Sequence, residues 1–550
     1  MSLRTERRSG HARRNAGELS CESMTTRLLR ILACAALLAG AAAAHAQAPA
    51  DRPGATEHRS TPPTYAVSFD AQTQSVAVQL CLADEHAKVV FAADSGWAMR
   101  FISDVRRGDA GSPGAAKVDS DDSGWHAANW RAGECLSWRA DLRAIAQEHK
   151  PDVGWQMGED FIAAPQLWLL RPDVQASANA ELSIQMPEHW SISAPWRELM
   201  PSSVTAKIKE QPSVAALSTK RYFHIPNTPP DWSAAVAFGR FTEERIALPG
   251  GTLRLTVLHG ADASERAKLR EWLDRVSRAV LSAYGRLPLP EVQVLVIPVG
   301  QLGRGGRDED RAQAVHFGQS VRGQGNALEL LVDPTRPAAE FADDWTAVHE
   351  LSHLMHPYLG DRGTWLAEGL ATYYQNVLRA RSGMLTPAQA WDRLYQGFKR
   401  GAKTPSEETL EQIASNMHRS HAYQRVYWAG AAYWLTVDRD LRRASAGKMN
   451  LETALSRFRD CCLPAYREWR PEDFVARLDV LAGSDVFAAR YREFAVMRQF
   501  PDWEKLYSDL GIRDGGEHLA FAADAQDAAI REAIMAPGNG TATAVDAATR

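Results

Sequence analysis

The chain from about residue 63 to 200 alternates apolar and polar residues. A period of two is typical of β-strands with one buried face. Asp, Gly, Ser and Pro residues separate the apolar runs, as expected for turns. We therefore predict an all-β sandwich domain over residues 60–200, followed by a linker from 201 to about 232. The clearest strand-like runs are residues 64–69, 75–80, 88–91 and 181–186.

The predicted β domain is rich in tryptophan. Eight of the 17 tryptophans of the chain lie between Trp97 and Trp196. An exposed stripe of these rings would indicate a carbohydrate-binding surface, whereas buried rings would indicate a packed core. Because large aromatic side chains are highly buried on average, we favour the core, with a few tryptophans at its rim.

The pattern becomes mixed after residue 233 and is largely helical from Glu368 to about residue 510. An amphipathic helix is predicted over 263–284, and the glycine-rich charged residues 299–314 predict a mobile loop. The Gly/Ala/Thr-rich residues 536–550 predict a disordered tail. The whole pattern predicts a multidomain chain, with the β-sandwich followed by an α/β domain over 233–383 and an α-helical domain over 384–530. Strands of the α/β domain are predicted at 252–258, 292–297, 314–319 and 327–332.

The N-terminus resembles an export signal. Arg27 and Arg30 precede an apolar run over 31–44, and Ala44-His45-Ala46 matches an A-x-A cleavage pattern. The apolar run is too short for a membrane span. We expect residues 1–46 to be an N-terminal extension and signal peptide cleaved after Ala46, with Met24 as a candidate start. The mature chain should then be periplasmic or secreted, without a stable membrane span.

Net charge and cysteine content limit the possible classes of protein further. The formal net charge is −4, and no basic stripe indicates nucleic-acid binding. Four cysteines follow residue 46, and an exported protein permits disulfides. They allow three pairings. Cys81 and Cys135 make a reasonable pair within one domain, whereas the state of the adjacent Cys461 and Cys462 is not fixed by the sequence.

The segment His349-Glu350-Leu351-Ser352-His353 is the most specific pattern in the chain. Two histidines at i and i+4 lie on one helix face, and neutral imidazole suits zinc. Glu350 follows the first histidine, where its carboxylate can act on a water molecule at the metal. A catalytic zinc needs a third protein ligand, and Glu368 on a second helix is the candidate. We predict one Zn²⁺ per chain, bound by His349, His353 and Glu368.

A chance match is the alternative, because H-E-x-x-H is a short motif. Its surroundings favour the metal site: apolar neighbours give the helix a buried side, and Pro357 and Gly360 fit a helix end. His356 follows at i+7, which would place it about 10 Å from His349 along a continuous helix. That separation excludes it as a ligand of the same ion, so we expect it in the pocket wall or at the helix end.

Six segments carry a resemblance to a known family: 349–353, Trp365–Tyr373, Val426–Ala431, Asp438–Arg442, Leu478–Phe487 and, in the β domain, Met186–Trp190. Together they resemble the gluzincin zinc metallopeptidases, in particular the glycyl aminopeptidase family and, more distantly, the aminopeptidase N-like enzymes. The resemblance implies a thermolysin-like α/β zinc domain over 233–383. It also implies that Tyr427 donates a hydrogen bond to the oxyanion, where the alternative is a core tyrosine on an amphipathic helix.

Two features depart from the family pattern. Only fourteen residues separate His353 from Glu368, fewer than is usual in either family. The stretch Gly323–Glu329 stands where these families carry an acidic motif that holds the substrate's amino group. Glu329 is a candidate for that group, although a solvent-facing strand residue is favoured. Thr372, at i+4 from Glu368, is a candidate for orienting a ligand histidine.

The resemblance implies an exported zinc-dependent metallopeptidase that hydrolyses peptide substrates with a zinc-activated water. Glu350 would move the proton. An aminopeptidase is favoured over an endopeptidase of the same fold. A non-catalytic zinc-binding envelope protein is the alternative from another class, although pure metal binding would not require Glu350. A zinc hydrolase of non-peptide amides is a third reading. The physiological substrate and the oligomeric state are not indicated by the sequence.

Overall fold

The computed structural model describes residues 61–92, 98–109, 116–150, 152–174, 179–200, 218–300 and 313–538. The predicted signal peptide, with Met24 and Ala46, lies outside these residues, as do most of the predicted mobile loop and tail. All described residues fall in one unit, Ser60–Arg550. Among them, no helix combines the length and apolar composition that a membrane span requires.

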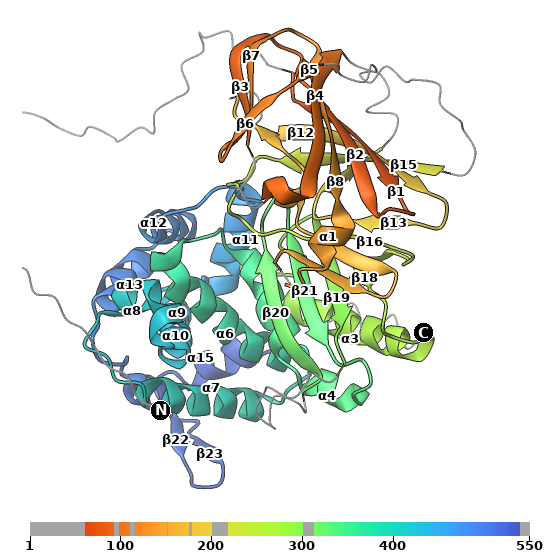
Figure 1. Ribbon diagram of the computed structural model, residues 1–550. Coiled ribbons are helices and arrows are strands. Elements are labelled where there is room, and N and C mark those ends of the chain that lie inside the picture. Colours follow the sequence, from red (N-terminus) through yellow and green to blue (C-terminus); the bar gives the residue numbers. More distant parts are fainter. Residues whose placement is uncertain are drawn as a thin grey trace, which may run out of the picture. The chain divides into compact units, whose positions relative to one another are not determined.

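The N-terminal part consists of three β-sheets (Figure 1). Apolar side chains from all three, among them Val67, Phe91 and Phe238, share one core, as the period-two pattern predicts. A short helix, α1 (Leu142–Ala146), also packs into it. The eight-stranded sheet has the order β14 (Arg197–Leu199), β15 (Ser218–Pro226), β12 (Asn179–Pro187), β1 (Thr64–Asp70), β2 (Ser75–Cys81), β8 (Glu134–Asp141), β4 (Ile102–Asp109) and β5 (Ala116–Lys117). The two four-stranded sheets have the orders β13 (Ser191–Ser193), β16 (Val236–Gly239), β10 (Asp160–Ala163), β9 (Gly154–Met157), and β11 (Arg171–Pro172), β3 (His86–Ala92), β7 (Gly124–Trp130), β6 (Asp119–Asp121).

Two strands follow the predicted end of the β domain at residue 200. The linker prediction is wrong for residues 218–226, because they form β15, which pairs with β12 along its whole length. Strand β16 likewise pairs with β10. Charged side chains interrupt the alternation of apolar and polar residues in β15. One of them is Arg221, which forms an ion pair with Glu198. The β-sheets of this part therefore extend to residue 239.

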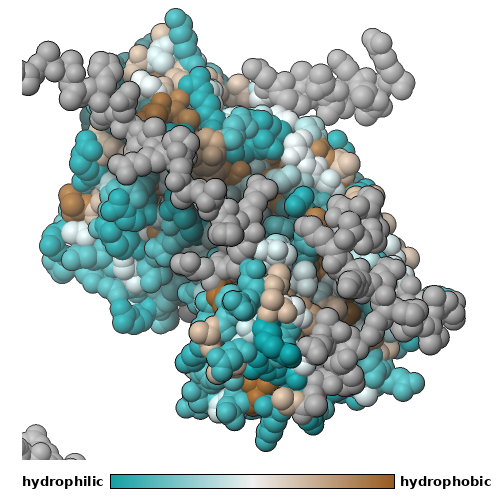
Figure 2. Space-filling view, turned by 90° about the horizontal axis from the view of Figure 1, so that it is seen from above, coloured by the Kyte–Doolittle hydropathy of each residue, from teal (hydrophilic) through white to brown (hydrophobic). Residues whose placement is uncertain are grey.

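Most of the described tryptophans of this part are core residues. Six of the eight are buried: Trp125, Trp130, Trp138, Trp168, Trp190 and Trp196. On the face drawn in Figure 2, hydrophobic residues are scattered among hydrophilic ones. The packed core is therefore the correct reading for these six rings.

Two disulfides join the four cysteines after residue 46. Cys81 and Cys135 lie directly opposite each other on β2 and β8, and they are bonded as predicted. Cys461 and Cys462 are bonded to each other at the end of α11 (Leu451–Cys462).

The central sheet has five strands, and all four predicted strands of this part are present. Strands β18, β19 and β21 run parallel, while β20 lies antiparallel at the edge. One face packs on helices and the other on the sheet that contains β9, β10 and β16. Strands covered on both faces carry continuous apolar runs, as β19 and β21 do. The order is β17 (Glu244–Leu248), β18 (Gly251–Val257), β19 (Glu291–Pro298), β21 (Ala327–Val332) and β20 (Val315–Val321).

Helices cover one face of this sheet and make up the C-terminal part, drawn in teal and blue in Figure 1. The predicted amphipathic helix is α3 (Ala263–Leu281), which Asp262 caps. Thr386 caps α7, which begins at Pro387. The others are α4 (Ala338–Asp343), α5 (Thr346–Ser352), α6 (Thr364–Arg381), α7 (Pro387–Ala402), α8 (Leu410–Ser415), α9 (Met417–Ser420), α10 (Tyr423–Ala444), α11 (Leu451–Cys462), α12 (Pro471–Ala482), α13 (Val486–Ala495), α14 (Trp503–Asp509) and α15 (Ala528–Met535), with a hairpin of β22 (Ile512–Asp514) and β23 (Leu519–Phe521).

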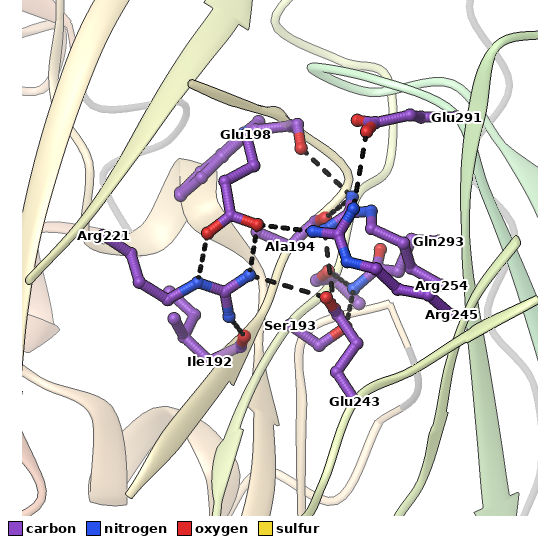
Figure 3. A network of polar contacts seen from close by, with 12 residues as sticks. Ile192, Ser193, Ala194, Glu198, Arg221, Glu243, Arg245, Arg254, Glu291 and Gln293 are labelled. Carbon is purple, nitrogen blue, oxygen red and sulfur yellow. Dashed lines mark hydrogen bonds and ion pairs between the residues drawn. The ribbon is translucent and has the colours of Figure 1, made fainter. Parts of the chain in front are cut away.

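A polar network joins the N-terminal sheets to the central sheet (Figure 3). Arg254 on β18 is almost completely buried and donates to the carbonyls of Ala194 and Trp196, at 2.5 and 3.0 Å. It also forms an ion pair with Glu243 at 3.4 Å. Burial lowers the pKa of Arg254, and the negative charge of Glu243 opposes that shift.

We expect Arg254→Met to destabilise the protein by about 3 kcal/mol or more, because it removes the donor to two buried carbonyls and leaves Glu243 with Arg221 alone. Arg245→Met is the matched control. Arg245 pairs with Glu198 at 2.6 Å, but half of its side chain is exposed, so its loss should cost less than about 1 kcal/mol. Urea unfolding of both variants measures the difference. Equal losses would contradict a special role for the buried arginine.

Candidate metal centre

The short helix α5 carries the H-E-x-x-H segment. Its apolar side chains Ala347, Val348 and Leu351 are buried in the core shared with α3 and α6. This packing turns His349 towards α6, which carries Glu368. The α-helix ends at Ser352, and a 3₁₀ turn continues it from His353 to Met355.

The three predicted ligands meet at one point. The ligand atoms of His349, His353 and Glu368 all lie within 4.8 Å of one another. Glu368 Oε2 is 3.2 Å from His349 Nε2 and 3.6 Å from His353 Nε2, and the two Nε2 atoms are 3.3 Å apart. Among the described residues, no other set of three or more His, Cys, Asp or Glu side chains converges in this way. The pairing of a short helix with α6 therefore assembles one compact donor set.

The outer nitrogens of both histidines are engaged. His349 Nδ1 lies 2.8 Å from Gln375 Oε1, and His353 Nδ1 lies 3.1 Å from His356 Nε2. Thr372 does not orient either histidine, since its buried hydroxyl has no hydrogen-bond partner among the described residues. Gln375, one helical turn further along α6, does so instead. The sequence could have indicated this role of Gln375, because Gln375 is at i+7 from Glu368 and shares its helix face.

His356 lies at the end of the helix, as expected, but its backbone path differs from the prediction. The prediction assumed a continuous helix, but the residue has extended backbone dihedrals and lies beside His353. It is not one of the three converging residues, as expected. Burial, aided by the positive charge of Arg322, lowers the pKa of His356 well below its ordinary value. The ring is therefore a neutral hydrogen-bonding group.

The donor set fits a zinc ion. A Gln amide oxygen can only accept, so the hydrogen of a neutral His349 lies on Nδ1 and its Nε2 presents a lone pair. Two Nε2 lone pairs and a carboxylate then face one another in a buried space, which is unfavourable without a cation. Two imidazoles and one carboxylate are also a known catalytic zinc set that leaves a position open.

The carboxylate of Glu368 holds its charge despite burial. Burial raises its pKa, but the electrostatic attraction between the carboxylate and the adjacent His353 and His349, together with their hydrogen bonds, lowers it well below the ordinary value. The same pairing acts on His349. Burial lowers its pKa, and the contacts with Glu368 and the charge of Glu350 outweigh that effect and raise it. Both shifts favour an ionised Glu368 carboxylate beside the two imidazoles.

Glu350 faces the edge strand β20. The hydroxyl of Ser320 on that strand donates to the main-chain carbonyl of Glu350. Gly318 comes so close to α5 that an added Cβ would lie 2.6 Å from Thr346 Cγ2 and 3.0 Å from Glu350 Cγ. The strand and the helix are therefore in direct contact, and Glu350 itself is 8% exposed.

Tyr427 on α10 lies at the same site. Its ring stacks on His349, with centroids 6.0 Å apart and planes 17° apart. Burial, followed by the negative charge of Glu368 and a hydrogen bond with it, raises the pKa of Tyr427 far above its ordinary value. The tyrosine is therefore a neutral O–H donor beside the donor set, and only part of its side chain is buried.

Two glycines bring α10 close enough for this contact. An added Cβ on Gly430 would lie 1.9 Å from the carbonyl oxygen of Trp365 and 2.7 Å from Gly369 Cα. Gly369 directly follows Glu368, and Gly430 is one turn from Tyr427. The Tyr-x-x-Gly spacing thus has a steric reason: the two helices cross where both lack side chains.

We expect Gly430→Ala to lower stability by about 1–3 kcal/mol, as overpacking does. In an uncrowded helix the same change would be stabilising by up to about 1 kcal/mol, so the sign alone is informative. Separation of α10 from α6 should also lower kcat for any hydrolysis at this site. Thermal unfolding and steady-state kinetics measure both. A more stable variant would show that the helices do not constrain each other here.

The expected exposure of Glu329 is wrong. Glu329 on β21 is 2% exposed and accepts a hydrogen bond from Gln319 at 2.7 Å. Burial raises its pKa to about 7. Its neighbours Leu328 and Leu330 face the helices, whereas Leu331 faces the sheet of β9, β10 and β16. Side chains alternate along a strand, so Glu329 points away from the donor set.

Comparison with known proteins supports the resemblance seen in the sequence. Residues 348–434 match the sequence model of the M61 glycyl aminopeptidase family. This match spans all three candidate ligands and Tyr427, and it confirms the resemblance to gluzincin aminopeptidases. A search of curated proteins found no match.

Solved structures share the fold. An aminopeptidase N family protein from Idiomarina loihiensis aligns with 82% of this chain and 78% of its own, at 14% identity and a TM-score of 0.58. An M1 zinc metallopeptidase from Deinococcus radiodurans aligns with 80% of this chain and 93% of its own, at 14% identity and a TM-score of 0.46. The first likeness shows that the several sheets and the C-terminal helices follow an aminopeptidase N-like multidomain fold.

Proposed function

We propose that this protein is a zinc-dependent metallopeptidase, with one zinc bound by His349, His353 and Glu368. The convergence of these three side chains within 4.8 Å, beside Glu350 and Tyr427, is the observation that carries the proposal. The match to a peptidase family over the same residues supports it.

Each residue has a chemical role in the proposed reaction. Zinc, when bound, supplies Lewis acidity, which polarises a carbonyl group and lowers the pKa of water. Glu350 accepts a proton from the attacking water and delivers it to the leaving amine. Tyr427, which burial keeps protonated, donates a hydrogen bond to the oxyanion of the tetrahedral intermediate. Gln375 holds His349 in position.

An aminopeptidase is the preferred form of this activity, because the family that matches residues 348–434 is an aminopeptidase family. An extended peptide can pair with the edge strand β20, because no described strand pairs with its outer edge. Glu329 does not hold the substrate amine in this proposal, since it points to the other face of the sheet. We also propose that the protein is exported, on the A-x-A pattern at Ala46.

The second candidate is a non-catalytic zinc-binding envelope protein. It shares the donor set but needs neither Glu350 nor the tyrosine beside His349. The placement of both next to the donor set favours the enzyme.

Metal content and peptide cleavage test the proposal together. We expect the mature protein to carry one zinc and to cleave peptides with a free amino terminus faster than blocked ones, with loss of activity on adding a chelator. The double variant His349→Ala/His353→Ala should carry no stoichiometric zinc, because two of three ligands are gone. His189→Ala, at an exposed histidine of the β part, is the control and should keep the metal. Full zinc retention in the double variant would refute the site, and zinc without any hydrolysis would favour the binding protein.

A further inference from the structure

His356 owes its position to the residue that follows it. A proline disfavours helical backbone at the preceding residue. His356 accordingly has φ −136° and ψ 160°, and the helical path ends at Met355. Its imidazole therefore turns back to His353, three residues earlier, instead of lying one helical turn further on. The His-Pro pair at 356–357 thus bends the chain next to a metal ligand.

The hydrogen bonds around His356 fix which of its nitrogens carries the hydrogen. His356 Nδ1 lies 2.7 Å from the carbonyl oxygen of Pro357, and a carbonyl can only accept. Nδ1 must therefore donate, and in a neutral ring Nε2 must then accept. Nε2 is 3.1 Å from His353 Nδ1, so His353 donates to it. His353 Nε2 is left with its lone pair directed at Glu368 and His349.

The main chain of the same turn is also fixed. Arg322, which directly follows β20, donates to the carbonyl of His353 and, at 3.2 Å, to that of His356. His356 is 3% exposed, so water does not compete for its nitrogens. The ring has little freedom to leave His353.

The geometry points to His356 as a positioning residue that holds His353 in the tautomer and orientation that present Nε2 to the zinc. This inference rests on the proposed zinc site. The other histidine provides a comparison within the same protein, because His349 Nδ1 faces the amide oxygen of Gln375 at 2.8 Å. An imidazole and a carboxamide thus perform the same task for the two ligands. Partners of this kind typically contribute about 10–100-fold to metal affinity.

The test removes the hydrogen-bond acceptor of His353 and then restores it as a glutamine amide oxygen, the group that already faces His349. His356→Phe and His356→Leu remove the acceptor at two side-chain volumes, and His356→Gln supplies an amide oxygen. Zinc affinity is measured by competition with a chromophoric chelator, and ligand geometry by the absorption spectrum of the cobalt-loaded protein. We expect Phe and Leu to weaken zinc binding by about 10–100-fold and to change the cobalt spectrum. Gln should recover most of the affinity and the parent spectrum.

Other outcomes overturn the inference. Parent-like zinc affinity in a folded Phe or Leu variant would show that His356 only packs. In that case the substitutions would lower the melting temperature of the metal-free protein and leave zinc affinity unchanged. A Gln variant as weak as both apolar ones would show that accepting a hydrogen bond is not the function. NMR spectra of the ¹⁵N-histidine-labelled protein test the tautomer in the unsubstituted chain. The signals of His356 are assigned by their loss in His356→Gln. A hydrogen on Nε2 of His356 would refute its role as the acceptor for His353. A parent that binds zinc but cleaves no peptide would refute the peptidase proposal and leave this comparison valid, whereas a parent without zinc would refute both.

Discussion

Glu350→Gln should abolish peptide hydrolysis while the protein keeps its fold and its zinc. The substitution replaces one oxygen by an NH₂ group and leaves His349, His353 and Glu368 in place. A carboxamide cannot accept the proton, so the loss of general base catalysis should reduce kcat by about 10²–10⁴-fold. Steady-state kinetics with zinc analysis of the same sample measures both effects. Binding and chemistry should therefore separate in one variant.

Glu329→Gln is the matched control. It makes the same change at a buried carboxylate that lies on the other face of the central sheet. We expect kcat and KM for peptides with a free amino terminus to remain at parent values. A large rise in KM would return Glu329 to the role of amine-binding residue. Hydrolysis by Glu350→Gln at the parent rate would mean that Glu350 is not the base.

The sequence predicted the donor set because its information is local. The spacing of His349 and His353 follows from helix geometry, and the packing of α6 against α5 brings Glu368 to them. Four of the five strands of the central sheet were also predicted, and β19 and β21 were the clearest because burial on both faces leaves mostly apolar runs. Strand β17 was missed. In the β part, the predicted pair Cys81–Cys135 also forms.

What the sequence missed depends on contacts between distant segments or on small changes of backbone path. His356 was placed on a continuous helix, although Pro357 bends the chain one residue earlier. Glu329 was read as exposed because a charged residue usually is, and only the sheet packed on its face buries it. Helix periodicity places both Thr372 and Gln375 on the face of α6 that carries Glu368. The packing of α6 against α5 brings Gln375 to His349. Such choices follow from packing and not from spacing.

The contact between Tyr427 and the donor set makes a second large effect testable. If the hydroxyl donates to the oxyanion, Tyr427→Phe should lower kcat by about a hundredfold or more, the scale for losing one such donor. Substrate binding should change little, because the interaction forms mainly in the transition state. The ring remains, so its stacking on His349 should survive.

Tyr433→Phe on the same helix supplies the comparison for a core tyrosine. Tyr433 is fully buried, and its hydroxyl donates to the carbonyl of Phe487 at 2.9 Å. Losing that bond should cost about 1 kcal/mol of stability or somewhat more and leave kcat almost unchanged. Tyr427→Phe should behave in the opposite way, with a low kcat and a nearly parent melting temperature. If instead both variants lose stability and keep kcat, Tyr427 is a packing residue, and the oxyanion donor of the proposed peptidase must come from another side chain.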